Sequence, residues 1–129
     1  MLNEQELRAC KKQLDDRFHE LREEIRLELL ESDDQSYIDL AGRVHDLGEA
    51  SVADLLVDLK LASVDRHIQE IRDIDAALMR VATSSYGVCT DCRSPIALER
   101  LQAYPTAKRC RPCQARYERL HAGPGMASL

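Results

Sequence analysis

Four cysteines in the last third of the chain carry the clearest chemical signal. They form two C-x2-C pairs, Cys89 with Cys92 and Cys110 with Cys113, and 17 residues separate the pairs. A C-x2-C turn directs two sulfur atoms at one ion, and two such turns complete a tetrahedron around zinc. Four thiolates leave no open coordination position for water, so the sequence predicts one structural Zn²⁺ ion.

Disulfides and a redox dithiol are the alternative uses of such cysteine pairs. Disulfides belong to oxidising compartments, whereas Met1–Asn3 leads directly into acidic residues without a basic and apolar leader, which favours a cytoplasmic protein. A redox C-x-x-C pair usually opens a helix within a βαβ unit, and this pattern is not seen. Zinc is therefore the preferred interpretation. Cys10 stands apart from the pairs, and we assign it no role.

Basic residues gather around the cysteines. Residues 86–129 carry 7 Lys/Arg and 3 Asp/Glu, whereas residues 1–85 carry 11 and 20. Zinc with four thiolates has a formal charge of about −2, which neighbouring cations would offset. The same cations could contact nucleic acid, and the sequence leaves both interpretations open. The candidate basic contact surface consists of Arg93, Lys108, Arg109, Arg111 and Arg116.

The elements that must position the cysteines are helical. Residues 4–31 place apolar side chains at the heptad-like positions Leu7, Leu14, Phe18, Leu21 and Ile25. Residues 51–82 carry a second series, Val52, Leu56, Leu59, Val64, Ile71, Ile74, Leu78 and Val81. Two antiparallel helices would bury these seams against each other, with the reversal near Gly48. After Tyr86-Gly87, which is typical of a helix stop, residues 96–103 are expected to form short strands or turns over the zinc site, and residues 116–120 a closing helix.

Composition excludes several classes of protein. The chain has 129 residues with 32% charged and only 4% aromatic residues, which is typical of long solvated helices rather than a thick core. No run approaches the roughly 20 apolar residues of a membrane span. No Ser-His-Asp grouping, glycine-rich phosphate loop or H-E-x-x-H helix occurs, so we do not expect an enzyme.

One acidic pair lies at the expected reversal. Asp46 and Glu49 flank Gly48. Carboxylates at the end of a narrow rod could be delivered into a deep channel and act there through their charge. Composition alone favours an ordinary polar turn.

The cysteine segment resembles the zinc finger of the DksA/TraR family of bacterial transcription regulators. The resemblance rests on Tyr86–Cys92, Pro95-Ile96, Glu99–Ala107 and Cys110–Gln114, and with the preceding helix it covers roughly residues 40–120. Arg93 departs from the pattern, because most members have glycine there, and it is expected to hold a less comfortable backbone conformation.

The resemblance implies a mechanism. Family members bind RNA polymerase directly rather than promoter DNA, and they insert a coiled-coil hairpin into its secondary channel while the zinc domain holds the rim. Acidic residues of a D-x-x-D motif at the hairpin tip regulate the polymerase after docking. Asp46 and Glu49 fall on that motif, with Glu49 one methylene longer than the usual aspartate. An acidic hairpin also suits a basic channel.

Two departures concern ppGpp. Responsive family members form a ppGpp site with the polymerase through basic residues. Gln114 stands where they carry a lysine after the last cysteine, and Asp73 replaces another of these residues. We therefore expect weak or absent synergy with ppGpp.

The favoured interpretation is a regulator of RNA polymerase that is monomeric and cytoplasmic. We expect neither sequence-specific DNA binding nor a membrane segment. The alternatives are a nucleic-acid-binding zinc module and a coiled-coil adaptor with structural zinc. The expected fold is mainly α: an antiparallel hairpin over residues 1–85 with its tip near 46–50, a four-cysteine finger with a closing helix over 86–121, and a flexible tail over 122–129.

Overall fold

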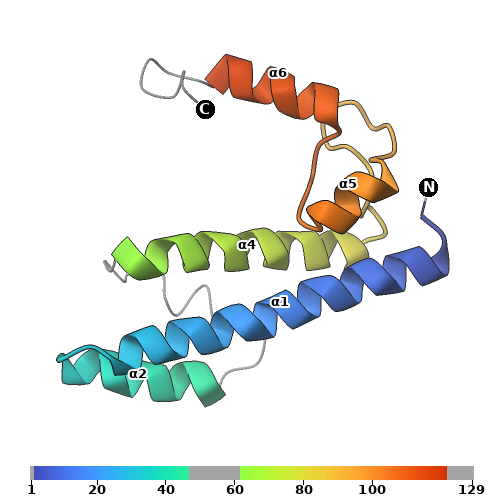
Figure 1. The fold of residues 1–129 in the computed structure, drawn as a ribbon. Helices are drawn as coiled ribbons and strands as arrows, with labels where there is room; N and C mark the ends of the chain where they lie inside the picture. The colour runs from blue at the N-terminus through green and yellow to red at the C-terminus, as the bar shows by residue number, and fades with distance from the viewer. Residues whose placement is uncertain (1, 47–61, 122–129) are drawn as a thin grey trace.

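The computed structural model describes residues 2–46 and 62–121. Within these ranges the chain is helical, as predicted, and the one β feature is an isolated antiparallel bridge between Val88 and Pro95. Figure 1 shows a rod of helices with a small cysteine-containing lobe at one end. Among the described residues, no helix is long and apolar enough to cross a membrane. The predicted tail, 122–129, lies outside the described residues.

Helix α1, Glu4–Leu30, forms the spine of the rod. Asn3 caps its N-terminus in a capping box, accepting from the Glu6 backbone N–H while the Glu6 side chain accepts from the Asn3 N–H. The predicted apolar seam is buried, with Leu7 only partly so. The buried residues are Cys10, Leu14, Phe18, Leu21, Ile25 and Leu29. The sequence therefore predicted both this helix and its buried face.

The chain turns back directly after α1. The Ser32 hydroxyl accepts from the Asp34 N–H, and the Asp34 carboxylate accepts from the Ser36 N–H at 2.9 Å. Helix α2, Gln35–Asp46, then runs antiparallel along α1 (Figure 1) and buries Ala41 and Val44 completely. The chain thus already reverses between α1 and α2, before the reversal that was expected near Gly48. The expected tip comprises residues 46–50. Asp46 is the last residue of α2, and residues 47–50 lie outside the described part of the chain.

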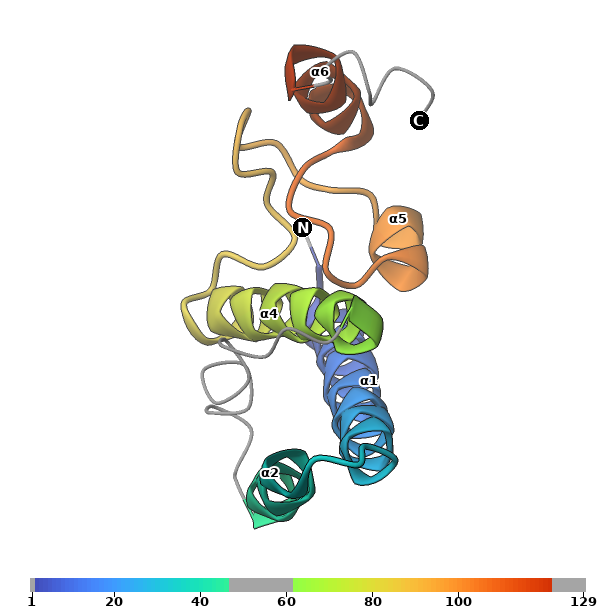
Figure 2. The same ribbon diagram turned by 90° about the vertical axis from the view of Figure 1, so that its left-hand side faces the viewer.

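Helix α4, Ala62–Ala82, packs antiparallel on the other side of α1, and Figure 2 shows α1 between α2 and α4. Its described apolar seam is buried at Ile68, Ile71, Ile74 and Ala77. Arg17 of α1 forms a two-pronged ion pair with Glu70 of α4, at 2.6 and 3.0 Å. The first part of the predicted second helix, residues 51–61, lies outside the described residues.

Helix α4 ends at Ala82, before the helix stop that was predicted at Tyr86-Gly87. The Ser84 N–H donates to the Val81 carbonyl and the Ser85 N–H donates to the Arg80 carbonyl, with Ser84 at a φ of 62°. This is the hydrogen-bond pattern of a Schellman C-cap, which normally favours glycine at the left-handed position. Tyr86 and Gly87 instead begin the cysteine lobe.

The lobe packs on the end of the rod where α1 begins and α4 ends (Figure 1). It holds two short helices, α5, Leu98–Ala103, and α6, Arg111–His121. The expectation of strands or turns over residues 96–103 is wrong for residues 98–103, which form helix α5. The helical turn places Leu101 in the core, where it is fully buried. The Gln13 side chain of α1 donates to the Gln102 carbonyl, which joins spine and lobe. Cys10 is 1% exposed and packs in this junction.

Candidate metal centre

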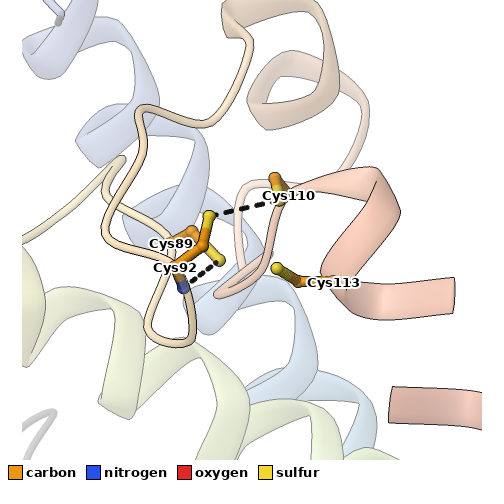
Figure 3. A group of neighbouring side chains, drawn as sticks. All are labelled: Cys89, Cys92, Cys110 and Cys113. Atoms are coloured by element: carbon orange, nitrogen blue, oxygen red, sulfur yellow. Dashed lines mark hydrogen bonds between the residues drawn. The ribbon is translucent and has the colours of Figure 1, made fainter. Parts of the chain in front are cut away.

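The first cysteine pair sits in a tight backbone hairpin. The Cys89 N–H donates to the Ser94 carbonyl at 2.8 Å, and the Arg93 N–H donates back to the Cys89 carbonyl at 3.0 Å. The Ile96 N–H donates to the Gly87 carbonyl at 2.8 Å and closes the base. These bonds hold Cys89 and Cys92 on one side of the loop (Figure 3).

The second pair lies where α6 begins. Cys110 immediately precedes the helix and Cys113 lies in its first turn, fixed by donation from the Gln114 N–H to the Cys110 carbonyl at 2.9 Å. The Thr90 N–H donates to the Lys108 carbonyl at 2.9 Å and ties the two cysteine segments together. As a result, all four sulfur atoms lie within 4.8 Å of one another.

The ionisation of the four thiols favours binding of a cation between them. The Cys92 N–H donates to the Cys89 sulfur at 3.5 Å. Burial opposes the charge on Cys89, but backbone N–H groups, including that of Cys92, lower its pKa to about 6. The neighbouring Cys110 sulfur raises the pKa of Cys113 to about 12. Four crowded sulfurs therefore cannot all ionise without a positive ion between them.

A single zinc ion satisfies this donor set. The four cysteines, drawn in Figure 3, converge from the hairpin and from the start of α6. Four thiolates fit the tetrahedral coordination of a closed, structural zinc site, which supplies folding energy rather than catalysis. The predicted cofactor, one structural zinc bound by four thiolates, is thus confirmed.

Arg93 occupies the expected unusual conformation. Its φ is 66°, the left-handed region that glycine adopts without steric cost. The position is the turn of the first cysteine hairpin, where the backbone must reverse to return from Cys92. The side chain is exposed.

The predicted basic surface is divided in the structure. Arg109 donates to Asp91 at 3.0 Å and its side chain is only 13% exposed. Arg116 donates to the Cys113 sulfur at 3.6 Å, which is the contact expected of charge compensation. Arg93, Lys108, Arg111 and Arg116 are all exposed, whereas Arg109 is not. The five residues therefore do not form one uniform contact face.

Two other residues from the sequence analysis come together. Asp73 of α4 and Gln114 of α6 both line a cavity of about 350 Å³ between the rod and the lobe. Arg80 and Lys108 line the same cavity. The departures noted at Asp73 and Gln114 thus lie in one place, although 41 positions separate them in the sequence.

Contacts that brace the finger were missed in the sequence analysis. The Tyr86 hydroxyl donates to the Pro105 carbonyl at 2.7 Å, and burial raises the Tyr86 pKa. Arg80 donates to the Thr106 carbonyl, and burial lowers the Arg80 pKa. These bonds end on backbone oxygens, which leave no residue signature at the accepting position. The sequence therefore offered no signal for them.

Comparison with known proteins agrees with this site. Residues 84–119 match the family model described as the prokaryotic dksA/traR C4-type zinc finger. The chain is 38% identical over 90 residues to the RNA polymerase-binding transcription factor DksA of Caulobacter vibrioides, covering 70% of this chain and 58% of that protein. The chain thus spans about three fifths of the length of that relative. It is 27% identical over 113 residues to the protein of the same name from Salmonella typhimurium, covering 88% of this chain and 72% of that protein.

Solved structures match over most of the chain. Transcription factor DksA2 from Pseudomonas aeruginosa has 27% identity and a TM-score of 0.62, covering 94% of this chain and 89% of that one. Such coverage includes the helical rod as well as the finger.

Proposed function

Because this chain is a DksA-like protein, we propose that it is a transcription regulator that binds RNA polymerase directly. The observation that carries the proposal is the four-cysteine finger packed on the end of a helical rod. The fold as a whole resembles a solved structure of transcription factor DksA2, with a TM-score of 0.62. Two similar proteins are named RNA polymerase-binding transcription factors. Such a role is non-catalytic and belongs in the cytoplasm.

In this proposal the rod enters the secondary channel of the polymerase and the finger lobe stays at the rim. The acidic excess supports this orientation, because residues 1–85 carry 20 Asp/Glu and 11 Lys/Arg. A negative rod is attracted into a channel lined by basic groups. Asp46 and Glu49 are the proposed acidic pair that acts near the active centre, and the protein acts as a monomer.

Two alternatives remain as separate hypotheses. A nucleic-acid module would use Arg93, Lys108, Arg109, Arg111 and Arg116, but Arg109 and Arg116 already have partners inside the lobe. It would bind free DNA or RNA with steep salt dependence. A coiled-coil adaptor would bind a stable partner other than polymerase.

The first test is binding of the zinc-loaded protein to bacterial RNA polymerase without DNA, in competition with a known secondary-channel factor. We expect competitive binding. Absence of binding at low salt would contradict the proposal and favour the two alternatives.

The second test separates docking from regulation. The double variant Asp46→Asn, Glu49→Gln should bind polymerase as the wild type does but lose its effect on transcription. The control Asp16→Asn, Glu20→Gln makes the same charge change at α1 side chains that are 56% and 62% exposed. Equal loss of regulation in both variants would mean that general charge, rather than this pair, is responsible.

A further inference from the structure

The two cysteine pairs receive hydrogen bonds from different kinds of donor. In the first pair, the Cys92 N–H donates to the Cys89 sulfur at 3.5 Å, so the hairpin backbone itself supplies the donor. In the second pair the donor is a charged side chain, because Arg116 Nη2 donates to the Cys113 sulfur at 3.6 Å. Among the side chains that the structure describes, Arg116 is the one cation with a hydrogen bond to a cysteine sulfur.

Burial explains why Cys113 needs a charged partner. Cys113 is 5% exposed, so little water can solvate its thiolate. A buried charge is costly unless a hydrogen bond or an opposite charge compensates it. Cys92, in contrast, is exposed, and water can stabilise its thiolate. Solvent therefore serves Cys92, whereas Arg116 serves Cys113.

Helix α6 fixes the contact between Arg116 and Cys113. The two residues are three positions apart in this helix, so their side chains lie on the same face about one turn apart. The guanidinium group is always charged and presents its N–H donors in a rigid plane. Hydrogen bonds from such a group are stronger than those between neutral groups. The nearby Arg109 cannot take over this role, because it donates to Asp91.

We propose that Arg116 is a positioning residue of the zinc site, which holds the Cys113 thiolate in place so that the finger opens first at Cys92. Partners outside the coordination shell orient metal ligands, and their loss typically lowers metal affinity by about 10–100-fold. Without Arg116, the buried Cys113 thiolate loses its compensating charge and becomes the most weakly held ligand. The inference concerns the finger alone and does not depend on the proposed function.

The test compares Arg116→Gln with the wild type in two measurements on the full zinc-loaded chain, without polymerase. The first is the rate at which zinc passes to an excess of a coloured chelator, which should rise about 10-fold in the variant. The second is the order in which the cysteines react with N-ethylmaleimide during zinc release, read by mass spectrometry of peptides. Cys92 should react first in the wild type, whereas Cys113 should react at least as early as Cys92 in the variant.

Two further variants separate the specific contact from general charge. Arg111→Gln is the matched control, because it removes the same charge from an exposed side chain that lies between the two ligands of the second pair. It should leave the release rate and the order of reaction unchanged. Arg116→Lys keeps a positive donor and should restore most of the wild-type release rate.

Three outcomes would overturn the inference. The first is release from Arg116→Gln at the wild-type rate. The second is equal acceleration in Arg111→Gln, which would assign the effect to general charge. The third is faster reaction of all four zinc-binding cysteines without a change in their order, which would mean that Arg116 only stabilises the fold of the finger.

A fourth measurement applies if Arg116→Gln loses its zinc before release can be followed. Zinc is then titrated into the reduced chains of the wild type, Arg116→Gln and Arg116→Lys in the absence of oxygen. We expect about 10-fold weaker binding in Arg116→Gln and recovery in Arg116→Lys. A loss of affinity that Arg116→Lys does not restore would overturn the inference.

Discussion

The guanidinium carbon of Arg109 lies 3.9 Å from the centroid of the Tyr117 ring, while the Arg109 Nε donates to Asp91. His121 stacks on the same ring at 4.0 Å between centroids. Asp91 lies between the first two cysteines and Tyr117 lies on α6, so Arg109 connects the two halves of the zinc site. This connection lies outside the four metal ligands and makes its own contribution to finger stability.

Replacement of Arg109 by lysine should destabilise the zinc-loaded finger by about 1–2 kcal/mol, because lysine keeps the charge but loses the planar stacking and fixed donor geometry. Denaturant unfolding and the rate of proteolysis within α6 measure the effect. Arg119→Lys is the control, because Arg119 is exposed on the same helix. An equal loss in both variants would mean that Arg109 does not act through Tyr117 and Asp91.

Replacement of Arg93 by glycine should stabilise the finger by about 1 kcal/mol, because glycine adopts the φ of 66° without steric cost. The measurement is the unfolding free energy of the zinc-loaded protein. Arg93→Ala removes the same guanidinium but keeps Cβ, so it should give no gain. A gain in Arg93→Ala equal to that in Arg93→Gly would show that charge, rather than backbone conformation, limits stability here.

Removal of zinc should unfold roughly residues 87–117 and leave much of the helical signal intact. Metal binding and local folding are coupled at a four-thiolate site, whereas α1 and α4 bury their own apolar seam. Chelation and Cys113→Ser should both increase proteolysis in this segment, while circular dichroism retains the signal of the rod. Cys10→Ser is a useful comparison, since it alters a cysteine outside the metal site. Unchanged proteolysis after chelation would contradict the prediction.

The sequence predicted those features that depend on regular spacing. The seam of α1 follows the heptad positions that bury Leu14, Phe18 and Leu21, and the two C-x2-C turns give the four ligands directly. The unusual conformation of Arg93 was expected from the family resemblance, in which most members carry glycine at this position, and not from spacing.

The features that were not predicted depend either on contacts between distant segments or on local hydrogen bonds that leave no periodic pattern in the sequence. Residues 98–103 form a helix because Leu101 packs into a core made largely by other elements. The reversal after α1 depends on local hydrogen bonds of Ser32 and Asp34, which compete with continuation of the helix and carry no periodic signal. Cys10 is explained only by its burial at the junction of spine and lobe.

The Arg17–Glu70 ion pair should make the α1–α4 contact sensitive to acid. Hydrogen bonds from Arg17 lower the pKa of Glu70, against the opposing effect of burial. A carboxylate with a lowered folded pKa stabilises the protein above its ordinary pKa and loses that contribution as pH falls through the folded value. Because the Glu70 side chain is 40% exposed, the effect should be small, about 0.2–1 kcal/mol.

Unfolding free energies of wild type and Glu70→Gln, measured from pH 7 to pH 3, test this sign. The wild type should be more stable at pH 7, and the difference should shrink toward pH 3. Glu20→Gln is the control, because Glu20 contacts the same arginine but its side chain is 62% exposed. A difference between wild type and Glu70→Gln that is constant with pH would contradict the prediction.

The cavity that contains Asp73 and Gln114 gives the last prediction, which concerns ppGpp. We expect weak or absent synergy in the wild type, because an acidic and a neutral side chain stand at Asp73 and Gln114 in this cavity. Its other charged lining residues are Arg80, Arg100, Lys108 and Arg109, of which Arg109 is paired with Asp91. A polyphosphate is repelled by a carboxylate and gains no charge-assisted contact from an amide. The double variant Asp73→Lys, Gln114→Lys should therefore gain synergy in transcription assays with RNA polymerase, with and without ppGpp. The control Gln5→Lys, Asp16→Lys makes the same total charge change on α1, outside this cavity, and should gain none. Strong synergy in the wild type, or equal gain in the control, would show that these two residues do not set the response.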